Sequence, residues 1–411
     1  MTTSTLSNNA ASDMTDHVSA HVALRSDVLL RLELLPSSHR TEAMRIWREL
    51  EVRLSNVRVT CSSDWTETWL RHYGGVVPHR FAVARREGTP VGIVLLTSGV
   101  GQHAGPFELH TCHIGTAGEH DFDSVCVEYN TLLVRNEDRA AFALALWDWA
   151  KQQTGMDEFH LDGFSADEVA PLLERHPEAT VARKVSRFFD LKLARDEGGE
   201  PISRLSTNTR SQIRRSMRNL GEPRGEWLDE TMPAEAALMK MIELHQARWM
   251  AVGEPGSYAS RMFREFHLEL LHRLIPSGRM GLFRVATEGQ VVGISQILID
   301  DNRVLLYQGG WATSEGSVSP GLVTDYLCLT ESLRRGYDAY DFLAGDSSHK
   351  QRLTTDAAEL VWAVWRQPGF KLAVLDTLRT VKQLLKCLEA TYYGTPAAHD
   401  TKVSPAVIDK N

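Results

Sequence analysis

The chain has 411 residues, of which 43% are hydrophobic and 24% charged, and its formal net charge is −8 at pH 7. This length allows two domains with full cores, and the composition excludes fibrous and low-complexity proteins. The negative charge argues against a surface dedicated to nucleic acid, and no apolar run approaches the roughly 18 residues of a membrane span. The five cysteines are odd in number and widely spread, which favours a reducing cytoplasm over a disulfide framework.

Polar segments are expected at both ends of the chain. Residues 1–25 are rich in Ser, Thr, Asn and Ala and contain no apolar core of a secretory signal. We therefore expect a disordered tail over 1–25 and a loose tail over 394–411.

Helical and alternating apolar patterns predict a first unit over 26–195. Its clearest helix covers 137–154, where Phe142, Leu146 and Trp149 fall on one face. The elements expected in chain order are helices over 40–54 and 62–73, strands near 80–86, 90–98, 107–113 and 125–134, the helix over 137–154, a strand near 158–162, a helix over 166–175, and a strand near 181–193.

A Gly-rich linker over 197–201 leads into a second unit, expected over 196–393. Three strands follow one another directly in this unit, with Glu288-Gly289 as the first turn between them. The expected elements are helices over 208–220, 234–251 and 258–275, strands near 281–287, 291–299 and 303–311, a helix over 320–335, strands near 339–343 and 360–366, and a helix over 370–390.

A seven-residue phrase occurs in both units, at Glu87–Ile93 and again at Glu288–Ile294. A second pattern, Gly-x-Asp-x-aromatic-x-apolar, runs from Gly155 and again from Gly336. Glu-Gly supplies a tight turn in each phrase, because glycine tolerates positive φ. We infer two diverged copies of one domain, each an α+β unit with a mostly antiparallel mixed sheet flanked by helices.

Three phrases in the second unit resemble one family of enzymes. They are Leu244–Trp249, Ser319-Pro320-Gly321 at the start of a helix, and Tyr340–Lys350 with its Gly-Asp loop. Together they are similar to the CelD/BcsL acetyltransferases of the GNAT superfamily, which are relatives of the two-domain Fem-type peptidyltransferases. The resemblance covers about 60–366 and is strongest over 205–366. It implies two tandem GNAT-like domains.

The resemblance implies acetyl-CoA or another acyl-CoA as the donor substrate, and it implies the residues that bind the donor. Ser319, Pro320 and Gly321 would hold its phosphates at a helix N-terminus, and Tyr307 and Gln308 would lie along its pantetheine. A well-capped helix without a ligand is the alternative for the first three. The ordinary GNAT pyrophosphate motif, Arg/Gln-x-x-Gly-x-Gly, is not present.

The corresponding helix of the first unit opens with Glu137 and Asp138, which would repel phosphate. We therefore expect a degenerate donor site in the first unit, which would help to shape the acceptor site instead.

Candidate acid–base groups follow the strand near 339–343. Asp346 and His349 are candidates to accept the proton of an acceptor amine, and Asp341 is a third candidate in the catalytic set. Lys350 would bind a carboxylate or a phosphate. A solvated polar loop with one internal ion pair is the alternative. His349 and Ser347 replace the Tyr and the acidic residue usual in the family.

His245, Arg248 and Trp249 are candidate substrate-binding residues on one helix, again through the resemblance. His245 lies on the apolar stripe, so a hydrogen-bonded core histidine is the alternative.

Two further groups of residues are candidates for binding a metal ion or an anion. His110, Cys112, His113 and His120 lack the spacing of a zinc site, and we expect no metal. Arg210, Arg214 and Arg218 share one helix face with Arg215 nearby, and they would suit a bound phosphate, a tRNA or acidic side chains.

The leading hypothesis is an acyltransferase that moves an acetyl or longer acyl group from acyl-CoA to an amine, rather than a hydroxyl, of a small molecule or a saccharide or cell-envelope precursor. One alternative is a Fem-like transferase that uses aminoacyl-tRNA. Another is a non-catalytic binding module in polysaccharide or natural-product biosynthesis.

Overall fold

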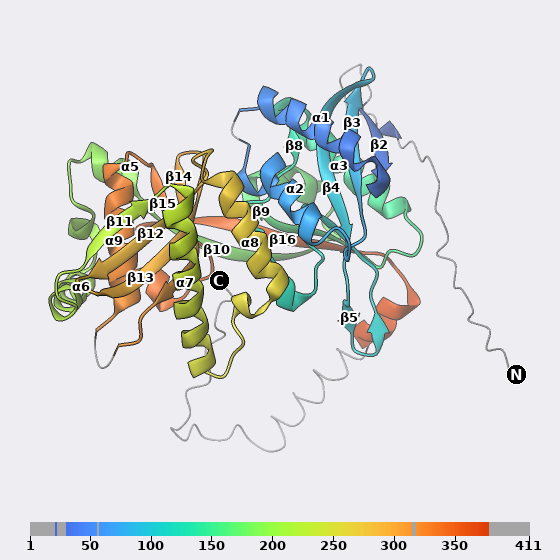
Figure 1. The fold of residues 1–411 in the computed structure, drawn as a ribbon. Coiled ribbons are helices and arrows are strands. Elements are labelled where there is room, and N and C mark those ends of the chain that lie inside the picture. Colours follow the sequence, from blue (N-terminus) through green and yellow to red (C-terminus); the bar gives the residue numbers. More distant parts are fainter. Residues whose placement is uncertain (1–20, 23–29, 56, 315–317, 378–411) are drawn as a thin grey trace, which may run out of the picture.

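The computed structural model describes residues 21–22, 30–55, 57–314 and 318–377 (Figure 1). The predicted tail over 394–411 lies outside these residues, as does most of the predicted helix over 370–390. The predicted tail over 1–25 also lies outside them, except for strand β1 (His21–Val22), which pairs with β2. No helix among the described residues is both long and apolar enough to span a bilayer.

The first half of the chain contains strands and helices close to the predicted ones. Its elements are β2 (Leu30–Pro36), α1 (Arg40–Arg53), α2 (Ser63–His72), β3 (His79–Arg86), β4 (Thr89–Ser98), β5 (His103–Ala104), β6 (Phe107–Glu108), β7 (Thr111–Ile114), β8 (Leu133–Val134), α3 (Asn136–Gln152), β9 (Glu158–Ser165), α4 (Ala166–Arg175) and β10 (Thr180–Asp190).

The second half begins with a short helix that the sequence did not predict. Its elements are α5 (Leu191–Asp196), α6 (Thr207–Asn219), β11 (Arg224–Leu228), α7 (Thr231–Ala251), α8 (Arg261–Leu274), β12 (Met280–Thr287), β13 (Gln290–Asp300), β14 (Arg303–Trp311), α9 (Pro320–Arg334), β15 (Ala339–Ala344), α10 (Ser348–Arg352) and β16 (Asp356–Arg366).

The two halves repeat one strand topology within a single mixed sheet of 14 strands. In the first half β2, β3, β4 and β7 are antiparallel neighbours, and β9 is parallel to β7. In the second half β11 to β14 are antiparallel neighbours, and β15 is parallel to β14. The predicted α+β class with a mostly antiparallel sheet is confirmed.

Two strands join the halves at the centre of the sheet, where the order is β9-β16-β10-β15. The C-terminal strand β16 pairs with β9 of the first half, whereas β10 pairs with β15 of the second. Each half thus contributes one strand to the neighbourhood of the other, and Figure 1 shows these strands between two lobes. The boundary between 195 and 196 stays a prediction.

The repeated phrase forms the same hairpin in both halves, including one irregularity. Ala84 pairs with Gly92 and Arg85 with Pro90, so Val91 is an extra residue on β4. Val285 pairs with Gly293 and Ala286 with Val291, so Val292 is the extra residue on β13. A shared bulge at the same place supports the duplication, because bulges depend on specific local sequence.

A glycine follows each bulge and lets a helix approach the sheet. A Cβ on Gly92 would lie 2.8 Å from a methyl of Val134 and 3.1 Å from Phe142 of α3. A Cβ on Gly293 would lie 2.2 Å from the hydroxyl of Thr324 on α9. The glycines of the repeated phrase therefore place α3 and α9 at equivalent positions against their strands.

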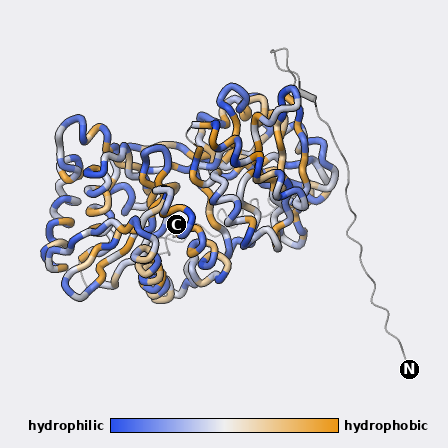
Figure 2. The backbone as a smooth tube through the Cα atoms, turned by 45° about the horizontal axis from the view of Figure 1, so that its top comes forward, coloured by the Kyte–Doolittle hydropathy of each residue, from blue (hydrophilic) through white to orange (hydrophobic). Residues whose placement is uncertain are grey.

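Alternation along the strands divides the core into layers. Residues on one face of both halves join α1, α2, α7 and α8 in one continuous cluster, in which Trp65 packs edge-on against Phe266 at 5.2 Å between ring centroids. On the opposite face, α3 and α4 cover the first half, and α5, α6 and α9 cover the second. Figure 2 shows the hydrophobic segments running through the interior of both lobes.

The prediction of a strand over 125–134 was wrong, since only Leu133 and Val134 belong to a strand. Cys126 and Tyr129 have φ values of 48° and 53°, which interrupt extended structure. Val125 and Tyr129 of this segment are buried against Tyr307 and Asp341 of the second half, and the apolar pattern resembles that of a strand. The sequence analysis also did not predict β2 or β11.

Candidate functional site

Strands β14 and β15 run together for three residue pairs and then part. Their parallel register ends at Leu305 and Asp341, although β14 continues to Trp311 and β15 to Ala344. Tyr307 is an extra residue on β14, because Gln296 pairs with Gln308 and Ile297 with Leu306. The bulge turns β14 away from β15, and among the described residues the backbone beyond Leu305 has no strand partner on that side.

Helix α9 begins beside the far end of β14. Pro320 occupies the first helical position, and the Ser319 side chain makes no capping hydrogen bond. The backbone N–H of Ser319 donates to the hydroxyl of Ser216 on α6 over 3.2 Å. Gly321 packs under the Trp311 indole, which would lie 3.0 Å from a Cβ at this position. The first turn thus lies between α6 and the Trp311 ring.

Two of the predicted site residues, Arg248 and His349, contact the Trp311 ring. The Arg248 guanidinium lies 4.5 Å from the centre of the indole, and the His349 ring stacks at 6.5 Å with 23° between the planes. His349 Nε2 in turn lies 2.7 Å from a carboxylate oxygen of Asp325. Arg248, Trp311, Gly321, Asp325 and His349 thus form one cluster beside the start of α9.

Asp325 is a site residue that the sequence analysis missed. Its side chain is buried (0% exposed), and its Oδ1 forms no hydrogen bond with any described residue. The signal was present in the sequence: Asp325 is the single acid in the apolar stretch Leu322–Leu327 and follows Gly321 by one helical turn. A carboxylate in such a place needs a partner, and His349 supplies it.

His245 and Trp249 are hydrogen-bonded to each other within α7. The Trp249 indole N–H donates to His245 Nε2 over 2.9 Å, and the Tyr258 ring packs edge-on at 5.2 Å. Burial lowers the pKa of His245 to about 4, so its imidazole is neutral near pH 7. This is the arrangement of a hydrogen-bonded core histidine, whereas Arg248 reaches the Trp311 cluster.

Asp341 lies at the point where β14 and β15 part. Its buried carboxylate accepts from Tyr129 over 2.6 Å, from Ser186 over 2.9 Å and from Arg303 over 2.6 and 2.9 Å. The N–H of Leu343 donates to it as well, over 2.7 Å. These five hydrogen bonds occupy the lone pairs of the carboxylate.

Asp346 and Lys350 take partners outside the Trp311 cluster. Asp346 is paired with Arg187 of β10 and is 49% exposed. The hydrogen bond from Arg187 lowers the pKa of this carboxyl. Lys350 donates to the carbonyls of Leu343 and Ala344 and so caps the end of β15.

Tyr307 and Gln308 are both buried on the parted stretch of β14. The Tyr307 hydroxyl donates to the carbonyl of Val125 in the first half over 2.5 Å. The bulge residue of β14 therefore touches the segment that follows β7.

The start of α3 differs from the start of α9. The Asp138 carboxylate is buried in the first turn of α3, where it pairs with Arg86 and, over 2.7 Å, with Arg135. An anion would have to compete with this carboxylate, since both favour the positive end of a helix dipole.

Comparison with known proteins identifies the class. Residues 207–351 match the family described as an acetyltransferase (GNAT) domain, and the second half of the chain is a domain of this kind, the CelD/BcsL-like family. The matched segment runs from α6 into α10 and contains the whole Trp311 cluster. No match was found among curated proteins.

Several solved structures are similar to this chain over most of its length. FemX shares 12% identity with a TM-score of 0.52, covering 80% of this chain and 96% of that one. A tandem GNAT protein from the clavulanic acid biosynthesis pathway shares 12% identity with a TM-score of 0.43, covering 82% of this chain and 99% of that one. A conserved Bacteroides thetaiotaomicron protein shares 12% identity with a TM-score of 0.47, covering 79% and 97%. At this identity the likeness to FemX concerns the fold.

Proposed function

We propose that the protein is an acyltransferase that moves an acetyl or longer acyl group from acyl-CoA to an amine of a small molecule or of a saccharide or cell-envelope precursor. The observation that carries the proposal is the parting of β14 and β15 beside the start of α9, within the segment that matches the GNAT family. That family implies an acyl-CoA donor and a small-molecule acceptor.

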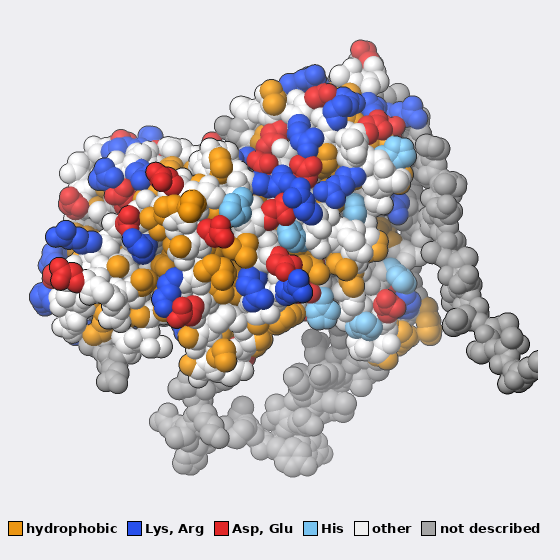
Figure 3. Space-filling view, in the orientation of Figure 1, with side chains coloured by type: hydrophobic (Ala, Val, Ile, Leu, Met, Phe, Trp, Pro, Cys, Tyr) orange, Lys and Arg blue, Asp and Glu red, His pale blue; other side chains and the backbone are white. Residues whose placement is uncertain are grey.

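The donor would bind along β14 and α9. Backbone groups of β14 beyond Leu305, including those of Tyr307 and Gln308, would pair with the amides of pantetheine, and the end of the β15 pairing at Leu305 supports this. The amides in the first turn of α9 have no acceptors within the helix and would face the phosphates. Helix α6 contacts the start of α9 through the hydrogen bond between Ser216 and Ser319. Its exposed arginines therefore add positive charge beside that turn. They are Arg214, Arg215 and Arg218. Figure 3 shows Lys and Arg side chains at the end of the molecule where α6 lies.

The transfer needs one proton acceptor. The amine nitrogen attacks the thioester carbonyl carbon and gives up a proton to a base of the protein. The carbon–sulfur bond then breaks, and coenzyme A leaves as a thiolate that receives this proton from the base. Of the three predicted acid–base groups, we assign this proton to His349, because Asp325 holds its Nε2 and leaves Nδ1 for a second partner. Asp341 then has a positioning role, since its hydrogen bonds fix the parting point.

The donor site is tested by titrating acetyl-CoA and longer acyl-CoAs into wild type, Ser319→Glu and Ser319→Gln. An added carboxylate beside the phosphates should weaken binding by roughly tenfold or more, or about 1.4 kcal/mol, whereas the neutral amide of the same shape should not. Glutamate at this position keeps the helix intact, because acids stabilise helix N-termini. Equal affinities in all three proteins would overturn the donor site.

The same titration separates the alternatives. The exposed arginines of α6 also suit the phosphates of a tRNA, and a Fem-like enzyme would bind tRNA with a steep dependence on salt. Binding of tRNA without binding of acyl-CoA would replace the proposed donor. A protein whose melting temperature responds to neither would be a non-catalytic module.

A further inference from the structure

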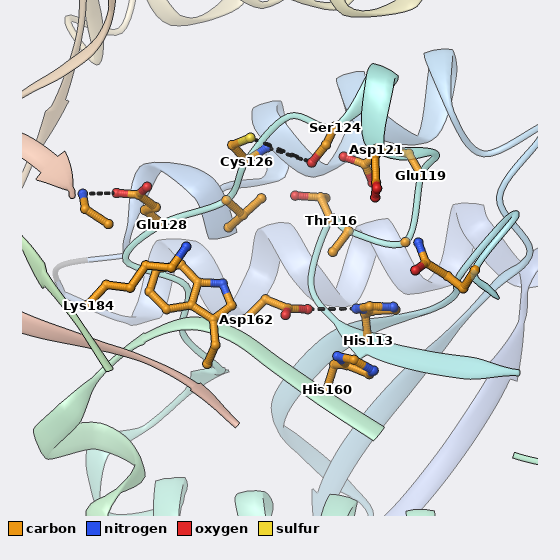
Figure 4. A pocket seen from close by; sticks show the side chains of 16 residues that line it. His113, Thr116, Glu119, Asp121, Ser124, Cys126, Glu128, His160, Asp162 and Lys184 are labelled. Atoms are coloured by element: carbon orange, nitrogen blue, oxygen red, sulfur yellow. Dashed lines mark hydrogen bonds and ion pairs between the residues drawn. The ribbon is translucent and has the colours of Figure 1, made fainter. Parts of the chain in front are cut away.

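A cavity of about 420 Å³ opens where the first half meets the end of β15 (Figure 4). Its walls come from the loop that follows β7 (116–128), Asp162 on β9, Lys184 on β10, Trp362 on β16 and Ala344 at the end of β15. Both halves thus contribute to it, through the two strands that they share. Its volume is that of a small-molecule site.

Several carboxylates line the cavity. Glu119 is 5% exposed, and its Oε1 accepts the N–H of Val125 over 2.7 Å. The Trp69 side chain also interacts with this carboxyl, but Oε2 has no well-aligned hydrogen bond among the described residues. Glu128 accepts the N–H of Ala344 over 2.6 Å. Asp162 is held by the His113 ring over 2.7 Å. A buried carboxylate oxygen without a donor calls for a ligand that supplies one.

One cation faces these acids. The Lys184 ammonium lies 4.3 Å from the centre of the Trp362 ring, which fixes its position at the cavity wall. Figure 4 shows Lys184 beside Asp162 and Glu128, across the cavity from Glu119. The cavity therefore offers both negative and positive groups to a ligand.

A hydrogen-bonded path connects the cavity with the parted strands. The N–H of Val125 donates to Glu119, and the carbonyl of the same residue accepts from the Tyr307 hydroxyl on the bulge of β14. Ala344, which lines the cavity, is the last residue of β15. A ligand in the cavity would therefore lie next to the proposed site of the acyl group.

We infer that this cavity binds the acceptor, and that the acceptor is a small zwitterion of the amino-acid class, with a primary amine and a carboxylate. The inference rests on the proposed function. The amine would donate to Glu119 and lie among the acids, and the carboxylate would pair with Lys184. A plain amine would make no use of Lys184, the one lysine or arginine in the cavity wall among the described residues, and a plain acid would bring a further negative charge beside Glu119 without supplying it a donor.

A metal ion is the alternative ligand for this cavity, because three of its residues carry possible metal-binding atoms. His113, His160 and Asp162 place ligand atoms within 4.8 Å of one another. Both nitrogens of His113 are already hydrogen-bonded, however, to Asp162 over 2.7 Å and to Thr111 over 3.0 Å. The His160 ring stacks on His113 at 4.4 Å, so the rings lie side by side instead of converging on one point. We assign the group to positioning Asp162.

The test measures coenzyme A release from acetyl-CoA with free amino acids, their decarboxylated amines and amino sugars as acceptors. Lys184→Met, which keeps the aliphatic contact with Trp362, should raise KM for amino acids roughly tenfold or more and leave KM for decarboxylated amines nearly unchanged. Glu119→Gln should raise KM for both classes. Lys192→Met on exposed α5 is the matched control.

Donor affinity, measured in the same proteins, separates the two proposals. If the enzyme acylates decarboxylated amines or amino sugars in preference to every amino acid, the inference of a zwitterionic acceptor is wrong, whereas the proposed acyltransferase activity is supported. Equal KM effects of Lys184→Met on both acceptor classes would also overturn it. If the protein binds acyl-CoA but no amino acid causes release of coenzyme A, the result contradicts this inference alone. If the wild-type protein does not bind acyl-CoA, the result contradicts the proposed function.

Discussion

The hydroxyl of Tyr129, in the first half of the chain, donates to the carboxylate of Asp341 in the second half over 2.6 Å. Asp341 lies where β14 and β15 part, and its carboxylate also accepts hydrogen bonds from Ser186 of β10 and Arg303 of β14. One buried carboxylate therefore fixes three strands and the loop from the first half at the proposed site.

Asp341→Ala should be strongly destabilising. The substitution would leave Arg303 and Tyr129 without their buried acceptor, and removing one partner of a buried pair costs about 3–5 kcal/mol. Urea unfolding of wild type and variant measures the loss. Asp346→Ala is the control, since its carboxylate is 49% exposed and should leave the midpoint near that of wild type. Equal stabilities of the two variants would contradict the structural role of Asp341.

Glu119 should make stability depend on pH. Burial raises the pKa of its carboxyl to about 7, whereas an unfolded glutamate titrates near 4.3. Because the raised pKa lets the folded state hold a proton that the unfolded chain has released, stability is present below the unfolded pKa and is lost as pH rises through about 7. Glu119→Gln lacks this group, so it should gain roughly 2–3 kcal/mol on wild type between about pH 5 and about pH 8.

Unfolding curves of both proteins at the two pH values measure this difference, and other titrating groups cancel in the comparison. A gap that stays constant with pH would show that Glu119 is ionised normally in the folded protein. If the advantage of Glu119→Gln over wild type in unfolding free energy became smaller toward high pH, the pKa of Glu119 would not be raised in the folded protein.

Arg58 and Asp300 hold the halves together through a second long-range pair. Arg58 donates to Asp300 over 3.2 Å, and the N–H of Val59 donates to the same carboxylate over 2.9 Å. Arg58→Met leaves a buried charge without its main partner and should cost about 3 kcal/mol. The double variant Arg58→Met with Asp300→Asn should lose less than Arg58→Met alone. Arg45→Met, at an exposed pair with Glu49, is the control.

The sequence predicts the elements of this protein better than it predicts its long-range contacts. The helix over 166–175 and the strand over 303–311 have the predicted bounds, because their apolar periods are set locally. Residues 125–131 misled the prediction because Tyr129 and its apolar neighbours are buried by the other half. No local pattern shows which segment will cover an apolar residue.

The same distinction applies to the candidate site. Glycine and proline at the start of α9 are visible in the sequence, since they follow from helix geometry. Glu119 and Asp325 were not singled out, because what marks each of them is a contact far along the chain: the Val125 link to Tyr307 for Glu119, and His349 for Asp325. A single acid within an apolar stretch was the available signal for Asp325, whereas Glu119 stands among polar neighbours such as His120 and Asp121 and has no such signal.

The pair formed by Asp325 and His349 leads to the last prediction. If His349 accepts the amine proton, His349→Gln should lower kcat by about 10²- to 10⁴-fold with acyl-CoA affinity unchanged. Asp325→Asn keeps the shape of the side chain but removes the charge that stabilises an imidazolium, so kcat should fall in the same direction. Stopped assays of coenzyme A release from about pH 5 to about pH 9, with acyl-CoA affinity measured in parallel, give both quantities. A fall in donor affinity with kcat unchanged would place His349 and Asp325 in the donor site and leave the proton to another group, and Glu119 in the cavity would be the next residue to test.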